Sequence, residues 1–150
     1  ALLSASPYVV DFKTTDGVIP PGESRTVTVQ AGMGPGVRTI SVVGMLVTTN
    51  DAFYGLSAAK VPFFVPFLRF DFSQDHDIPA YDAGSEANVE RCAEIPGPPC
   101  GNAEVPVEDV EAEGFVHVHA GIHGVGDLDP AEWDWRNPVA RVTIRVIRGN

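Results

Sequence analysis

The sequence predicts an all-β fold, a two-sheet antiparallel β-sandwich. Fifteen glycines and thirteen prolines interrupt the 150 residues too often for long helices, and no apolar pattern of period 3.6 persists beyond about two turns. Several short segments instead alternate apolar and polar residues with the period of two that is typical of half-buried strands. A hydrophobic content of 44% in a chain of this length favours one domain with one core, residues 1–150.

The first strand candidates lie in the N-terminal third. Residues 8–12 form a short apolar strand candidate, and residues 24–30 alternate valine with threonine and glutamine. Residues 39–48 are apolar and β-branched, which predicts a central strand buried on both faces. Gly44 within this strand indicates a bulge or a close approach of another backbone segment.

The later elements are interrupted by loops. Residues 114–119 and 139–147 read as strands, and Asp129 followed by Pro130 predicts an N-cap and one helical turn between them. In the last strand the apolar residues 140, 142, 144 and 146 are expected to face inward, and the polar residues 141, 143 and 145 outward. Residues 60–72 are the most aromatic segment, and two prolines there favour an edge strand or a strap across the end of the sandwich. Its phenylalanines fit the core, or alternatively an exposed surface that binds a partner.

Charge and motif content exclude several classes of protein. The net charge of −10 argues against nucleic acid and anionic membranes as partners, because both require clustered lysine and arginine. No apolar run approaches the roughly 18–20 residues of a membrane span. No nucleophile elbow or phosphate-binding glycine loop occurs, so no catalytic residues are assigned and an enzyme is not supported.

The two cysteines, Cys92 and Cys100, enclose a proline-rich loop of seven residues. A local disulfide fits this spacing better than a zinc site, because no histidine lies at zinc-ligand spacing nearby. A disulfide implies an oxidising compartment, so we expect a secreted, periplasmic or cell-surface protein.

Two short acidic turns carry the best candidate site. One contains Asp51, and the other contains Asp82, Ser85 and Glu86. If the turns meet at one edge of a sandwich, Asp51, Asp82 and Glu86 converge on one Ca²⁺ ion, which prefers carboxylate, carbonyl and water oxygens. The alternative is that both are ordinary turns whose side chains bind their own backbone.

The segments TTNDAFYG and YDAGSEAN, together with WRNPVARVTIRVIR near the C-terminus, resemble the spondin domain in its bacterial secreted form. The resemblance covers about residues 38–148 and implies a C2-like antiparallel sandwich found in matrix and adhesion proteins. It also implies calcium ligands at Asp51, Asp82 and Glu86. The chain departs from the animal pattern at Ala52, where the family has tryptophan, and at Glu86, where it has aspartate.

Three of the four histidines lie close together, at His117, His119 and His123. The first two point to the same side if they lie on a strand, and with His123 they could bind Cu²⁺ or Zn²⁺. Asp127 or Asp129 could then orient the imidazole rings. The alternative is that the rings are structural residues that fix the following glycine-rich loop.

The acidic segment 104–113 fits a solvated loop, with a second, weaker calcium site as the alternative. We therefore expect a calcium-binding module with a structural or adhesive role and a protein or matrix partner. The alternatives are a copper- or zinc-binding protein that uses the histidines, and a self-assembling fibre or surface-layer subunit. In the last case, copies associate through open strand edges, using the apolar N-terminus and the aromatic strap.

Overall fold

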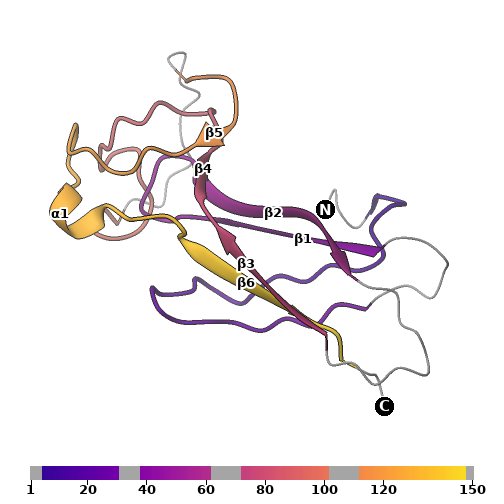
Figure 1. Ribbon diagram of the computed structural model, residues 1–150. Helices are drawn as coiled ribbons and strands as arrows, with labels where there is room; N and C mark the ends of the chain where they lie inside the picture. Colours follow the sequence, from indigo (N-terminus) through magenta and orange to yellow (C-terminus); the bar gives the residue numbers. More distant parts are fainter. Residues whose placement is uncertain (1–4, 31–37, 62–71, 102–111, 148–150) are drawn as a thin grey trace, which may run out of the picture. The chain divides into compact units, whose positions relative to one another are not determined.

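The computed structural model describes residues 5–30, 38–61, 72–101 and 112–147 (Figure 1). Most of the aromatic segment and of the acidic segment 104–113 lies outside these described residues, so the interpretations of both stay predictions. Contacts divide the chain into two units, Ala1–Arg38 with Val61–Phe64, and Thr39–Lys60 with Val65–Asn150.

The first unit contains turns but no strand between residues 5 and 30. The strands predicted at residues 8–12 and 24–30 are therefore wrong. The main-chain amide of Gln30 donates to a carboxylate oxygen of Asp11 at 2.8 Å. This hydrogen bond joins the two segments through a side chain, and not through the main-chain hydrogen bonds of a β-ladder. Val27 keeps 50% of its surface exposed, so the alternating pattern does not produce a buried face.

The second unit contains a four-stranded sheet with the order β1-β2-β4-β5 (Figure 1). Strand β2 pairs antiparallel with β4, with Ala52 opposite Asp82. Strand β4 pairs antiparallel with β5, with Asp82 opposite His117. This register places an acidic turn, Asp82 and the histidine strand at one end of the sheet. The strands are β1 (Arg38–Met45), β2 (Ala52–Val61), β4 (Ala80–Asp82) and β5 (His117–Val118).

Strand β1 confirms the strand predicted at residues 39–48 but corrects its burial. Half-buried and exposed residues alternate along its whole length, and Val43 exposes 72% of its surface. The apolar run is thus packed on one face, as in antiparallel sheets with one solvated side, and not on both. Gly44 marks a close approach, because a Cβ atom there would overlap the ring of Tyr54.

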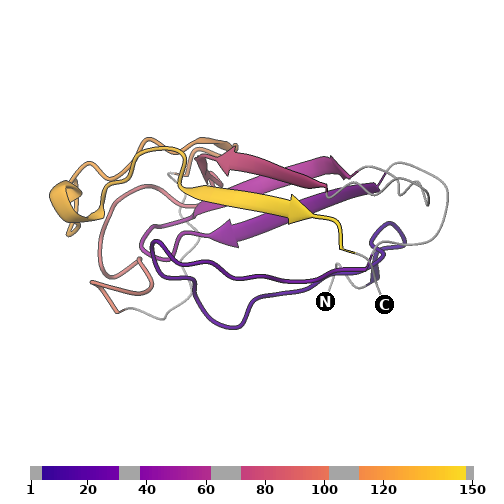
Figure 2. The same cartoon turned by 60° about the horizontal axis from the view of Figure 1, so that its bottom comes forward.

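A second antiparallel sheet pairs β3 (Ser73–Ile78) with β6 (Ala140–Arg145) over six residue pairs. Figure 2 shows these two strands running side by side. In β6, Ile144 is buried and Val142 is half-buried while their neighbours are exposed, which confirms the predicted alternation within the strand. Val146, predicted to face inward, follows the strand and is exposed. Because the described residues contain two antiparallel sheets and one short helix, the predicted all-β class is confirmed, and the arrangement is compatible with a sandwich.

The end of the second unit that carries the helix has a small core of its own. Helix α1 (Pro130–Trp133) begins after Asp129, whose side chain accepts from the Ala131 amide at 2.9 Å, so the predicted cap is confirmed. The disulfide between Cys92 and Cys100 is formed. Nearby, buried aliphatic side chains pack with half-buried indole rings and one half of the disulfide: Ile95, Ile122, Leu128, Trp133, Trp135 and Cys100.

The described ranges include no helix with both the length and the apolar character that crossing a membrane requires.

Candidate metal centre

Asp51 lies immediately before β2 and is only 3% exposed. One of its carboxylate oxygens, Oδ2, accepts three hydrogen bonds from the second acidic turn. The donors are the amide and the hydroxyl of Ser85, at 2.7 and 2.8 Å, and the amide of Glu86, at 3.0 Å. The other oxygen, Oδ1, is buried and has no hydrogen-bond partner. The two acidic turns therefore meet, and one anionic oxygen at their junction is unsatisfied.

Asp82 is fully buried at the end of β4. Its Oδ1 accepts from the Gly84 amide at 2.7 Å, and its Oδ2 accepts from the side-chain amide of Asn88. Gly84 has a φ of +67°, and a Cβ atom there would overlap the backbone of Phe115. The Gly114 amide donates to the Gly84 carbonyl at 2.9 Å. Glycine is thus required where the turn and the segment leading to β5 touch.

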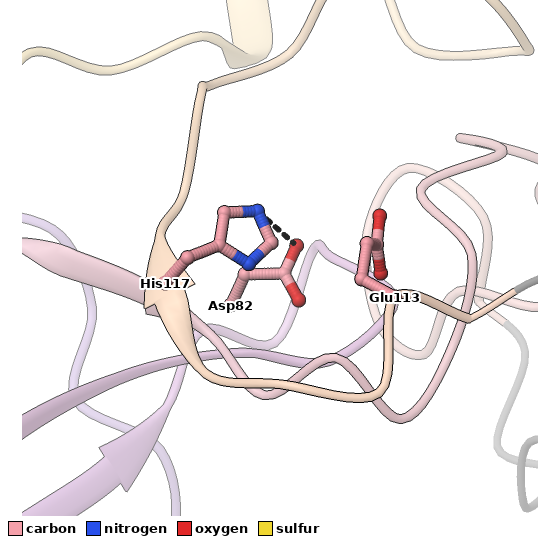
Figure 3. A group of neighbouring side chains, drawn as sticks. All are labelled: Asp82, Glu113 and His117. Atoms are coloured by element: carbon pink, nitrogen blue, oxygen red, sulfur yellow. Dashed lines mark ion pairs between the residues drawn. The ribbon is translucent and has the colours of Figure 1, made fainter.

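This contact brings Glu113 and His117 to Asp82. One ligand atom from each of these three side chains lies within 4.8 Å of the other two, and Figure 3 shows the three side chains gathered around a common space. The Nε2 atom of His117 lies 3.9 Å from Oδ2 of Asp82. Glu113 is exposed and His117 is half-buried. The group could hold a metal ion, and it draws a ligand from an acidic stretch that the sequence assigned to a solvated loop.

His119 is buried and held by two hydrogen bonds. Its Nδ1 accepts from the Gly121 amide at 3.0 Å, so the ring proton is on Nε2, which donates to Oδ1 of Asn88 at 3.0 Å. Burial lowers the pKa of His119 below its usual value, against the opposing effect of the Asp82 and Asp51 carboxylates. The ring is therefore a neutral structural imidazole.

The predicted ligand sets are only partly brought together. His123 is exposed, and among the described residues no three-histidine group lies at ligand distance. Asp51, Asp82 and Glu86 likewise do not form such a group through their side chains, and Glu86 reaches Asp51 through its main-chain amide.

The aspartates proposed to orient the histidines make other contacts. Asp127 accepts from the Cys92 amide at 2.8 Å, and Asp129 caps α1. The rings instead contact Trp135, which lies 5.0 Å from His119 between ring centroids, and Phe115, which lies 5.3 Å from His117.

Glu90 is a third buried carboxylate at this end of the sheet, and the sequence analysis did not identify it. It is 3% exposed and has a φ of +53°. Its two oxygens accept from three consecutive amides, those of His123, Gly124 and Val125, at 2.6, 2.7 and 2.9 Å. Successive amides that converge on one anion form a backbone nest. No local motif signals this role, because the donors lie more than thirty residues away.

No protein family, curated protein or solved structure matches the chain in the comparisons made.

Proposed function

We propose that the protein is a secreted or cell-surface calcium-binding β-sandwich module with a structural or adhesive role. A Ca²⁺ ion at the junction of the two acidic turns would hold the loop end of the four-stranded sheet rigid. The single observation that carries the proposal is the buried Oδ1 of Asp51, which has no hydrogen-bond partner.

The charges around this atom favour a cation. Asp51 and Asp82 are both buried. In the described part of the chain, Asp82 has histidines as its only ion-pair partners and contacts no lysine or arginine. Amide donors stabilise a carboxylate but do not neutralise it, and an uncompensated buried charge costs several kcal/mol. A bound divalent ion removes that cost.

Calcium fits the donors at the junction. Carboxylate oxygens of Asp51 and Asp82 are hard ligands, and Ca²⁺ accepts six to eight oxygens in flexible geometry, including main-chain carbonyls and water. The net charge of −10 raises the local cation concentration. The resemblance of the two turns to the spondin domain supports the same ion and an adhesive context with a protein or matrix partner.

The disulfide between Cys92 and Cys100 supports an extracellular or periplasmic location, because such bonds persist in oxidising compartments. The loop closed by the disulfide also contacts the segment that leads into the first acidic turn, the one that contains Asp51. The hydroxyl of Thr48 donates to the Pro98 carbonyl at 2.7 Å, and Gly97 lies against Val47. A rigid loop end would preserve a surface for a partner.

Calorimetric titration of chelator-treated protein with CaCl₂ tests the proposal. Wild type is expected to bind calcium stoichiometrically and to gain about 2.7 kcal/mol of stability when free calcium is 100 times Kd. Asp51→Asn is expected to abolish both the heat of binding and the rise in melting temperature. Asp75→Asn is the matched control, because Asp75 is an exposed carboxylate on β3. The proposal would be refuted if the melting temperature of the wild type changed with neither calcium nor chelator.

A further inference from the structure

We propose a second metal site on Asp82, Glu113 and His117 that binds a first-row divalent transition ion of the Zn²⁺ class. The ligands are one imidazole nitrogen and two carboxylate oxygens. The site goes beyond the calcium proposal, with which it shares Asp82. It rests on different observations, the proximity of the three ligand atoms and the contact of His117 Nδ1 with a main-chain carbonyl.

The hydrogen bond at the far side of the His117 ring fixes its tautomer. Nδ1 lies 3.3 Å from the carbonyl oxygen of Phe115, and because a carbonyl can only accept, Nδ1 carries the proton. The other ring nitrogen, Nε2, is then unprotonated and lies 3.9 Å from Oδ2 of Asp82. That distance is too long for a hydrogen bond, and two electron-rich atoms this close gain nothing from each other. A cation bound by both atoms would stabilise the pair.

Metal-binding histidines commonly show this arrangement, in which the nitrogen opposite the metal donates to a carbonyl or carboxylate. The separations also fit. Tetrahedral zinc with bonds of about 2.0–2.2 Å holds its ligand atoms about 3.3–3.6 Å apart, and the three candidate ligand atoms already lie within 4.8 Å of one another. Glu113 is exposed, so its side chain can close the remaining gap by changing rotamer. A fourth position is left for water.

A chain of hydrogen bonds orients the shared carboxylate. The Gly121 amide donates to Nδ1 of His119, Nε2 of His119 donates to Asn88, and the amide group of Asn88 donates to Oδ2 of Asp82. Although Nε2 of His119 lies 4.0 Å from the same Oδ2, its proton is directed to Asn88. His119 is therefore a positioning residue, and His117 is the ligand. The geometry separates two histidines that the sequence leaves equivalent.

Competition of the chelator-treated full-length chain with a chromogenic zinc indicator tests the assignment. Wild type is expected to bind one equivalent of Zn²⁺. His117→Gln is expected to weaken zinc binding by more than about 100-fold, because the loss of a residue that only orients a ligand already costs 10–100-fold. His123→Gln is the matched control and is expected to leave the affinity unchanged. The assignment is overturned if wild type does not bind zinc or if His123→Gln weakens binding as much as His117→Gln.

His117 is about one-third exposed, so the His117→Gln protein is expected to fold, and Glu113→Gln gives an independent test at an exposed residue. His119→Gln is expected to weaken zinc binding 10–100-fold in protein that remains folded. If His119→Gln only lowers the melting temperature of the metal-free protein, the positioning role is wrong.

The two metal proposals can fail separately. The calcium response is expected to persist in His117→Gln, and the zinc affinity is expected to persist in Asp51→Asn. A missing zinc site with an intact calcium response would overturn only the present inference. Zinc binding that depends on His117, without any calcium response, would overturn only the calcium proposal.

Discussion

Carboxylates on the two sheets of the second unit differ in their burial and in their hydrogen-bond partners. On the β3–β6 sheet, Asp77 is exposed and forms a bidentate pair with Arg141, at 2.6 and 3.0 Å. At the end of the four-stranded sheet, Asp51 and Glu90 are buried. Nearly all of their donors are main-chain amides, and none is a lysine or an arginine.

This difference determines what each carboxylate contributes. At the surface, water and a guanidinium group already neutralise the charge, so an ion pair contributes little. In the interior, main-chain amides hold the carboxylate in place but leave a net negative charge, and losing the carboxylate leaves buried amides without partners. The buried group is therefore both more important for folding and more sensitive to a cation.

The largest loss of stability is expected for Glu90→Ala. Three amides, at residues 123–125, lose their acceptor. These contacts are part-buried, so the cost of each lies toward the lower end of the range of about 1–3 kcal/mol for a fully buried donor without a partner. The expected loss is on the order of 3–5 kcal/mol in the free energy of unfolding, measured by urea denaturation in the presence of a chelator.

Glu90→Gln is the control for this prediction. The glutamine keeps one acceptor oxygen, so it is expected to lose less stability than the alanine variant. Equal losses in the two variants would show that the carboxylate's hydrogen bonds are not the cause. A loss below about 1 kcal/mol for Glu90→Ala would contradict the role assigned to Glu90.

Asp134 combines features of both groups. It is an exposed carboxylate, yet it accepts a hydrogen bond from the main-chain amide of Ile122 at 3.0 Å. This hydrogen bond is the main reason that the pKa of Asp134 lies below 3.8, its usual value. Its contribution to stability is therefore complete above about pH 3.8 and is lost as the pH falls through the lowered pKa of the folded state. The melting temperature of Asp134→Asn is expected to lie below that of wild type at pH 6, and the difference is expected to shrink at pH 2–3. A difference of the same size at both pH values would contradict this reasoning.

The smallest effect is expected for Asp77→Asn on the β3–β6 sheet. The side chain of Arg141 lowers the pKa of Asp77 by hydrogen bonding, but both side chains are exposed. The melting temperature is expected to fall only slightly in low salt and to equal that of wild type in 1 M NaCl, where the screening length is about 3 Å. A loss as large as that in Glu90→Ala would remove the distinction between the two sheets.

Short-range patterns in the sequence predicted those parts of the fold that depend on neighbouring residues. The alternation in β6 and the cap at Asp129 each follow from a few adjacent residues, whereas Gly44 is approached by the side chain of Tyr54 on another strand and not by backbone. The strand predicted at residues 24–30 has the same alternation yet does not form a ladder. A period of two therefore predicts a strand only where a partner strand is present.

The candidate site was less predictable because long-range contacts assemble it. The composition of the acidic turns was enough to single them out. The contact of Asp51 with the turn after β4, in contrast, depends on the register between β2 and β4, which the sequence did not predict. Glu113 joins Asp82 only because Gly84 admits a close backbone contact. The different roles of His117 and His119 depend on which carbonyl or amide faces each ring nitrogen, and residue spacing does not encode this.

The way Glu90 binds its neighbours has a consequence for sequence variation. It recognises peptide N–H groups, which every residue except proline supplies, so the exposed side chains at positions 123 and 125 can be exchanged without altering this anchor. Gly126 has no such latitude, since a Cβ atom there would overlap the carbonyl oxygens of Val89 and Glu90. Side chains at these two exposed loop positions can therefore be substituted while Glu90 continues to hold the backbone. Such substitutions would change the surface chemistry of the loop without changing the fold of the domain.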